Sequence, residues 1–312
     1  MWSFIIVPME PLIKIFLKLL HGWIKLFPEC LAEELIQDRP VEPLDKAVGP
    51  GPRHLGPAML DVRELQKDLI RMDHRSTAVF PAVVREDILN LQTLSLVEGQ
   101  YPVVKDIHRA GHEIASHGWD HRRVTTQQPA EFRASVRRTK ERLESLTGAP
   151  VLGFRAPSFS IVPGLEWAFD VLIEEGYRYD SSLFPVRRPR GYGYPGAQRS
   201  QHRFTRPSGT LLEFPIMTLR RFGVSIPAGG GAYFRILPYG LVRAAFAESE
   251  RNGTAGTFYL HPWELDPEQP RVAAPWLSRA RHYTGLRRTK PRLERLLSAF
   301  QFSAIADSAA LR

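Results

Sequence analysis

The stretch YPVVKDIHRAGHEIASHGWDH, residues 101–121, contains one complete unit of helix, glycine, strand and polar strand end. YPVVKDIHRAG repeats its apolar residues at helical spacing, which predicts a helix that ends at Gly111. HEIASH then has the short apolar run of a strand that ends at His117. This unit decides the fold because it recurs downstream.

Three further units follow the same order of helix, glycine, apolar strand and polar residue. They are residues 129–148 before Arg155, residues 165–176 before Asp180, and residues 238–252 before His261. Helices that alternate with apolar strands predict a mainly parallel sheet and the α/β fold class. In barrel enzymes of this class, the chemistry gathers at the carboxyl ends of the strands. We therefore expect the four strand-end residues to lie at one edge of the sheet.

The composition excludes several classes of protein. The 312 residues suffice for one large α/β domain or two smaller ones, and 43% of them are hydrophobic, as in a soluble globular protein. The net charge is +9, but no RNA- or DNA-binding signature accompanies it. We therefore expect no nucleic-acid partner. A polyanionic carbohydrate or a lipid-linked glycan would suit the positive charge as well as a nucleic acid would. Cys30 is the single cysteine, which excludes an internal disulfide.

Residues 1–37 form an apolar N-terminal segment. Prolines and charges interrupt its apolar run, so it fits neither a signal peptide nor a membrane-spanning helix. Apolar residues between Leu12 and Leu20 repeat at helical spacing. Two interpretations stay open, namely an amphipathic helix that contacts a membrane surface through residues 1–27, and a packed core helix. The compartment stays unknown, with a cytoplasmic or membrane-peripheral location favoured.

The remaining chain divides into three parts. Residues 38–58 are rich in proline and glycine and are expected to form a linker. Residues 59–270 are expected to form the main domain. Residues 271–312 then form a C-terminal extension.

The histidines of HGWDH are candidate metal ligands. His117 and His121 are four residues apart where a strand gives way to a loop, and Gly118 permits a turn between them. Imidazoles suit zinc or another divalent ion. Surface histidines without a metal are the alternative. His112 begins the strand and is expected to be a surface or second-layer residue.

Two strand ends offer further polar groups. Arg155 in GFRAPSFS could hold a carboxylate through paired hydrogen bonds, or it could tie down a loop. Asp180 in YRYDSSLFP could cap a turn through Ser181 and Ser182, or it could hold a histidine in one tautomer.

The last strand end is LHPWELDPEQP. His261 in this aromatic, proline-stiffened surround is a candidate general acid. Glu264 and Asp266 are expected to be loop residues.

HEIASHGWDH, GFRAPSFS, YRYDSSLFP and TFYLHPWE resemble, in this order, successive motifs of the polysaccharide deacetylases, carbohydrate esterase family 4. The sequence is most similar to the branch found with bacterial exopolysaccharide and exosortase systems, which carries an extension similar to PWLSRARHYTGLRRTKPRLERLLSAF. The resemblance covers roughly residues 98–302. It implies a distorted (β/α) barrel, irregular at its N-terminus, and metal-dependent removal of N-acetyl groups from a glycan.

The resemblance also implies a role for each motif residue. His117 and His121 match the two histidine ligands of a divalent metal, for which zinc is the favoured ion. Arg155 matches the arginine that positions the catalytic base. Asp180 matches the acid that pairs with the catalytic histidine, and His261 matches that histidine, which protonates the departing amine.

One motif of the family has no counterpart in the sequence. The family begins with a strand that ends in paired aspartates, the catalytic base and the third metal ligand. Asp61 in AMLDVRE is the nearest candidate for the base, and a helix N-cap is its alternative role. Without a carboxylate the two histidines would bind a metal weakly. We therefore expect an impaired deacetylase; the alternatives are a catalytically silent glycan-binding protein and a membrane-attached scaffold for exopolysaccharide assembly.

Overall fold

The computed structural model describes residues 82–83, 102–186, 193–221, 223–269, 271, 276–308 and 311. The N-terminal segment 1–37, the linker 38–58 and Asp61 lie outside these ranges, so the expectations for them stay predictions. Among the described residues, no helix has the length and apolarity needed to cross a membrane.

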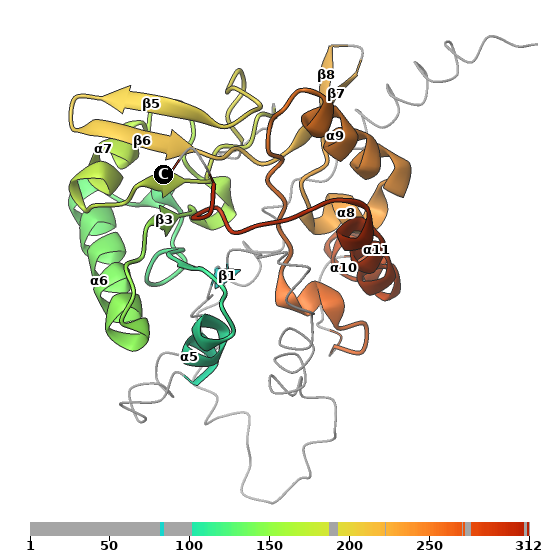
Figure 1. Cartoon of the computed structure of the whole chain (residues 1–312), viewed down its shortest axis with the longest axis horizontal. Coiled ribbons are helices and arrows are strands. Elements are labelled where there is room, and N and C mark those ends of the chain that lie inside the picture. Colours follow the sequence, from blue (N-terminus) through green and yellow to red (C-terminus); the bar gives the residue numbers. More distant parts are fainter. Residues whose placement is uncertain are drawn as a thin grey trace, which may run out of the picture.

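A row of short parallel strands runs through the molecule (Figure 1). They are β1 (Ala82–Val83), β2 (Ile114–Ala115), β3 (Gly153–Phe154), β4 (Tyr179–Asp180) and β6 (Gly209–Glu213). Each pairs in parallel with the next, with the link between β2 and β3 made by a bridge from Ser116 to Phe154. The predicted α/β class with a mainly parallel sheet is confirmed. The strands do not close into a complete barrel among the residues that are described.

Two antiparallel hairpins were not predicted from the sequence; the first extends this row at β6, and the second is a separate two-stranded sheet. β5 (His202–Arg206) pairs with β6, and β7 (Thr218–Arg221) pairs with β8 (Val224–Pro227). The expected strand TFYL pairs only through two parallel bridges, Ile216 with Thr257 and Gly230 with Tyr259. Through these bridges, the segment that leads to His261 lies parallel to the chain that follows β6.

The four predicted helices are confirmed. They are α5 (Pro102–Arg109), α6 (Pro129–Thr147), α7 (Trp167–Glu174) and α9 (Tyr239–Arg251). α6 has clear start and stop signals, because the Glu131 side chain accepts a hydrogen bond from the Gln128 backbone at 2.8 Å and Gly148 ends the helix in the left-handed region at φ 69°. The helices that were not predicted are α8 (Gly231–Ile236), α10 (Trp276–Tyr283) and α11 (Leu286–Ala299).

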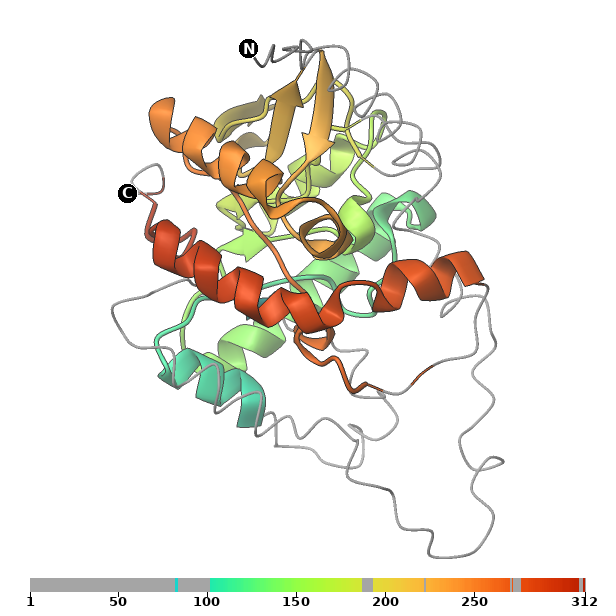
Figure 2. The ribbon, with the colours of Figure 1, turned by 90° about the vertical axis from the view of Figure 1, so that its right-hand side faces the viewer.

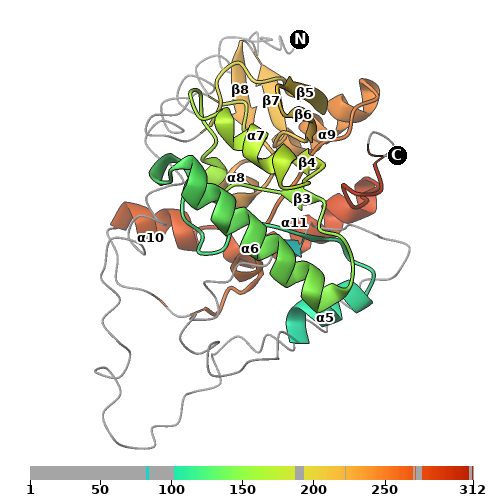
Figure 3. The same ribbon diagram turned by 90° about the vertical axis from the view of Figure 1, so that its left-hand side faces the viewer.

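Apolar side chains pack in two main clusters. One lies around α6 and α7 and contains Phe132 and Phe169. The other lies around α8, α9 and α11 and contains Phe234 and Leu293. Figure 2 shows α10 and α11 running across one side of the molecule, and Figure 3 shows α6 across the opposite side. Of these two helices, α11 contributes Leu293 and Leu296 to the second core.

Candidate functional site

His117 follows β2, and a hydrogen bond to the next strand orients its ring. Its Nδ1 lies 2.6 Å from the backbone carbonyl oxygen of Arg155. A carbonyl oxygen can only accept, so Nδ1 carries the proton and the neutral ring has its lone pair on Nε2. This is the arrangement that fixes a metal-binding histidine.

The rings of His117 and His121 lie edge to face, with centroids 5.0 Å apart and an interplanar angle of 67°. A zinc–imidazole bond of about 2.1 Å puts the ring centroid about 3.2 Å from the ion. Two centroids at the observed separation would subtend about 100° at a shared ion, near the tetrahedral angle of about 109°. The separation of the two rings is therefore that expected for two ligands of one divalent ion. Among the described residues, no group of three histidine, cysteine or acidic side chains could complete such a site.

Backbone strain is concentrated in the two loops that follow β2 and β3. The residues other than glycine with positive φ in the described ranges are His121, Ser158 and Phe159, with φ of 56°, 56° and 51°. Such conformations cost about 1–3 kcal/mol each and cluster at functional sites. His121 belongs to the histidine pair, and the other two follow Arg155 closely.

Arg155 is buried and ties the ends of β3 and β4 together. Its Nε donates to the Ser181 carbonyl oxygen at 3.1 Å, and its Nη2 donates to the Ser181 hydroxyl at 2.8 Å. Burial lowers the pKa of this guanidinium, and the nearby tyrosines Tyr179 and Tyr259 oppose that shift. The loop-tying role is therefore observed, and the role in holding a catalytic base stays a prediction.

Asp180 is fully buried and caps a turn. Its Oδ2 accepts a hydrogen bond from the Ser182 backbone N–H at 2.9 Å, and its Oδ1 accepts one from the Ser182 hydroxyl at 2.6 Å. Asp180 also lies directly opposite Glu213 in the parallel pair of β4 and β6. Two carboxyl groups are thus buried side by side at the strand ends.

Glu213 is the more protonated member of this pair. Burial and then the charge of Asp180 raise its pKa well above the ordinary value. Burial also raises the pKa of Asp180, but the hydrogen bonds from Glu213 and Ser182 and the charge of Arg155 oppose that shift. Glu213 Oε1 accepts a hydrogen bond from the Leu183 backbone at 3.0 Å. Our sequence analysis missed Glu213, although GTLLE has the same signature of an apolar strand with a polar end.

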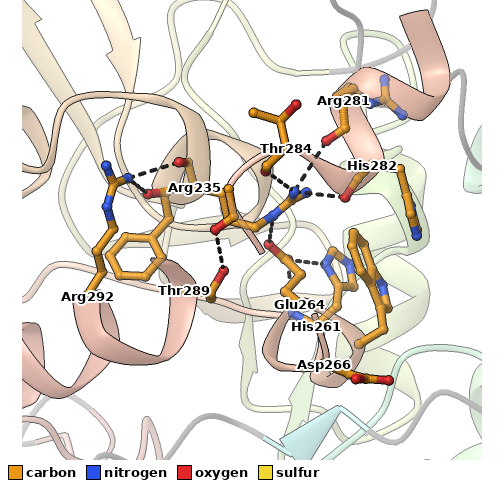
Figure 4. Close-up of polar contacts among 12 residues, drawn as sticks. Arg235, His261, Glu264, Asp266, Arg281, His282, Thr284, Thr289 and Arg292 are labelled. Carbon is orange, nitrogen blue, oxygen red and sulfur yellow. Dashed lines mark hydrogen bonds and ion pairs between the residues drawn. The ribbon is translucent and has the colours of Figure 1, made fainter. Parts of the chain in front are cut away.

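His261 has a different carboxylate partner from the one predicted. Its Nδ1 lies 2.8 Å from Glu264 Oε1, which also accepts a hydrogen bond from the His261 backbone at 3.2 Å (Figure 4). No hydrogen bond joins Asp180 to His261 in the described part of the chain, so the predicted contact between them is not found. The physical reason is local, because the turn Pro262–Leu265 folds the Glu264 side chain back onto His261.

Glu264 was expected to be a loop residue, and that expectation is wrong. Its side chain is fully buried, and its second oxygen, Oε2, accepts a hydrogen bond from Arg235 Nε at 2.6 Å. Burial alone would raise the pKa of Glu264, but the hydrogen bond and charge of His261 and the charge of Arg235 outweigh it and lower the pKa. The spacing of His261 and Glu264 is that of a capping box, which is a signal that the sequence contained. Asp266 is a loop residue, as predicted, and its Oδ1 accepts a hydrogen bond from the Glu268 backbone at 2.9 Å.

Tyr259 connects the strand-end residues to His261. Its ring lies 5.9 Å from the Arg155 guanidinium carbon and 5.7 Å, centroid to centroid, from the His261 ring. Arg155 in turn contacts His117 through its carbonyl oxygen. The described motif residues therefore form one connected set.

Two family models match the chain. Residues 92–165 match the model described as polysaccharide deacetylase, and residues 181–310 match a domain of unknown function, DUF3473. The first match supports a polysaccharide deacetylase domain and contains the histidine pair and Arg155. The second begins directly after Asp180 and contains His261 and the C-terminal helices.

Individual relatives are distant. Chitin deacetylase 1 of Bombyx mori is 31% identical over 111 residues, which are 33% of this chain and 20% of that protein. A solved structure from Mycobacterium smegmatis, described as a polysaccharide deacetylase, has 20% identity and a TM-score of 0.43, and the match covers 65% of this chain and 64% of that one. A structure from Pseudomonas aeruginosa with a similar description has 18% identity and a TM-score of 0.42, over 66% and 60% of the two chains.

Proposed function

We propose that this protein is a metal-dependent hydrolase that removes N-acetyl groups from an exopolysaccharide or a related glycan. The observation that carries the proposal is the connected set of motif residues, in which Arg155 contacts His117 through its carbonyl oxygen and contacts His261 through Tyr259. The family match over residues 92–165 supports the same chemistry.

His117 and His121 are the proposed ligands of the divalent ion, with zinc favoured. When bound, the ion would supply Lewis acidity to the attacking water and to the acetamide carbonyl. The hydrogen bond from His117 Nδ1 to the Arg155 carbonyl holds that ring with Nε2 as the coordinating atom. In this proposal the third ligand comes from outside the described residues.

The remaining roles fall to groups that move or hold protons. His261 donates the proton that the departing amine needs, and Asp61 is the proposed base, which takes the proton of the attacking water. Arg155 and Asp180 keep the strand ends in place through Ser181 and Ser182. Because Asp61 lacks the second aspartate of the family motif, we expect the activity to be weak.

Metal content and acetate release from N-acetylglucosamine oligomers test this proposal. The purified 312-residue chain should bind one divalent ion and release acetate, and replacement of both His117 and His121 by alanine should abolish both properties. His112→Ala is the matched control and should retain both. Asp61→Asn should abolish acetate release but leave glycan binding unchanged, whereas persistent release would exclude Asp61 as the base.

A catalytically silent glycan-binding protein is the second candidate. It is favoured by the Arg155 side chain, which is tied to Ser181 through two donors and so has a structural role that needs no catalytic base. This candidate predicts that the chain binds N-acetylated oligomers without releasing acetate at any metal concentration.

A further inference from the structure

We propose that Glu264, held by Arg235 and the turn between α10 and α11, is a positioning residue that sets the tautomer of His261. The catalytic role of this contact rests on the proposed function. The effect of Glu264 on the His261 tautomer can be measured without any activity. Figure 4 shows the three side chains together, with the Glu264 carboxylate between the imidazole and the guanidinium.

The Glu264 carboxylate has no freedom to change its partners. Oε1 faces the His261 ring and backbone, and Oε2 faces Arg235 Nε. The glutamate and arginine side chains are only 0% and 2% exposed, so water cannot replace either contact. An ionised carboxylate can only accept, so His261 Nδ1 must carry a proton. The neutral imidazole then has its lone pair on Nε2, and 35% exposure of the His261 side chain leaves part of it open to solvent.

Arg235 is in turn fixed by the C-terminal helices. Its Nη1 lies 3.3, 2.9 and 2.8 Å from the carbonyl oxygens of Arg281, His282 and Thr284, at the end of α10 (Figure 4). The last carbonyls of a helix have no partner within the helix, so these oxygens need an external donor. A guanidinium in this position satisfies them and cannot rotate away from Glu264 without losing them.

α11 secures the same junction from the other side. Arg292 Nη1 donates to the carbonyl oxygens of Phe234, Arg235 and Leu237 at 2.6, 3.0 and 3.0 Å, around the end of α8. Arg235, which lies on α8, thus caps the end of α10, and Arg292, which lies on α11, caps the end of α8. The C-terminal extension therefore holds the carboxylate that orients His261.

The other groups beside His261 do not compete for its Nδ1 proton. Trp263 stacks between the rings of His261 and His282, at centroid distances of 5.6 and 4.2 Å. Burial, followed by the charge of Arg235, lowers the pKa of His282 to about 4, so this ring is neutral near pH 7. Tyr259 meets the His261 ring edge to face at 5.7 Å. Within the described part of the chain, the ring is hydrogen-bonded to the charged Glu264 and, through it, linked to Arg235.

This arrangement limits proton exchange to one atom. The imidazolium form of His261 would keep Nδ1–H on Glu264 and give up its Nε2 proton to the amine as the carbon–nitrogen bond breaks. The ring that remains is the neutral Nδ1–H tautomer, which the Glu264 carboxylate holds through the same hydrogen bond.

Glu264→Gln should invert the tautomer. Arginine can only donate, and its charged, buried hydrogen bond is the stronger one, so the amide oxygen should face Arg235 and the amide NH₂ should face His261, with loss of the 3.2 Å hydrogen bond from the His261 backbone N–H. Nδ1 must then accept, which forces the proton of the neutral ring onto Nε2. Nitrogen-15 chemical shifts of the full chain, assigned through His261→Gln, report this change directly. Acetate release should also fall by about 100-fold or more.

Glu175→Gln is the matched control, because Glu175 is a partly buried glutamate that binds Arg133 and Arg137 far from His261 in the sequence. It should change neither the tautomer nor the activity. An Nε2–H tautomer in the unmodified protein would overturn the proposal without any variant, and so would an Nδ1–H tautomer in Glu264→Gln. If the tautomers behave as expected but the unmodified chain releases no acetate, the positioning role stands and the proposed function fails.

Discussion

Glu213 and Glu264 are both fully buried, yet their pKa values shift in opposite directions. Glu213 faces a second carboxyl group, Asp180, so burial and like charge act together to raise its pKa. Glu264 faces Arg235 and His261, whose hydrogen bonds and charges outweigh the effect of burial. Burial therefore does not fix the protonation state of a carboxyl group, whereas its partners do.

The difference gives the two regions different chemical capabilities. A protonated Glu213 can donate a hydrogen bond to Asp180, and this lets two carboxyl groups share the end of the sheet with one negative charge. An ionised Glu264 can only accept, and this fixes the direction of each hydrogen bond around it. At the strand ends the protonation of Glu213 can therefore change with pH, whereas the hydrogen bonds around the ionised Glu264 keep one direction.

Arg235→Ala should have the largest effect on the unfolding free energy, because it removes the buried partner of Glu264. The substitution leaves the Glu264 charge buried without its arginine and leaves the last carbonyls of α10 without a donor. Loss of one member of a buried ion pair typically costs about 3–5 kcal/mol of unfolding free energy. Urea denaturation measures the loss. Arg137→Ala on α6 should barely move the denaturation midpoint, because Arg137 is 56% exposed and Glu175 keeps its second partner, Arg133; an equal shift in both variants would contradict the prediction.

Gly285→Ala should disturb the same junction less severely. A Cβ at this residue would lie 2.7 Å from the Arg235 carbonyl oxygen, and φ of Gly285 is 81°. The combined strain should lower the unfolding free energy by about 1–3 kcal/mol. Gly196→Ala is a suitable control, because its φ is 84° but nothing lies within 4 Å of the added atom. The excess loss in Gly285→Ala isolates the steric contact with Arg235, and thermal unfolding of both variants measures it.

The sequence predicted the strand-end region better than the region around Glu264 and His261. Helical periodicity and terminal glycines are local signals, so they located α5, α6, α7 and α9 and the strand ends that carry His117 and Arg155. They could not show that Asp180 would pair with Glu213, because that contact depends on the register between β4 and β6. The family resemblance supplied the role of His261 but assigned its carboxylate partner to Asp180.

The Glu264 network depends on contacts that are distant in the sequence. Arg235 lies 29 residues before Glu264 and 47 residues before His282. No local pattern connects these positions, although an arginine within the apolar run AYFRIL is an indication of a buried charge. Only the packing of α8 against the C-terminal helices brings them together.

Glu213→Gln should remove a loss of unfolding free energy with rising pH, which the lowered pKa of Glu264 does not produce. A carboxyl group whose pKa is raised by folding stabilises the protein below its unfolded pKa, near 4.5, and loses that contribution as the pH rises through the folded pKa. Glutamine mimics the protonated form, so the variant should be the more stable protein at pH 8 by about 1 kcal/mol. Denaturation at several pH values tests this. A constant difference from about pH 4 to pH 8 would show that folding does not raise the pKa of Glu213.

Asp266→Asn should have the smallest effect, and it sharpens the contrast with Glu264 because the sequence suggested the same loop role for both residues. Figure 4 shows Asp266 turned away from the Arg235 network, and its Oδ1 accepts a hydrogen bond from the Glu268 backbone at 2.9 Å. Asparagine retains an oxygen that can accept this bond. The unfolding free energy should therefore change by no more than about 0.5 kcal/mol, and the nitrogen-15 shifts of His261 should stay those of the Nδ1–H tautomer. A tautomer change in this variant would mean that any loss of negative charge near His261 has that effect, and the specific role of Glu264 would then be lost.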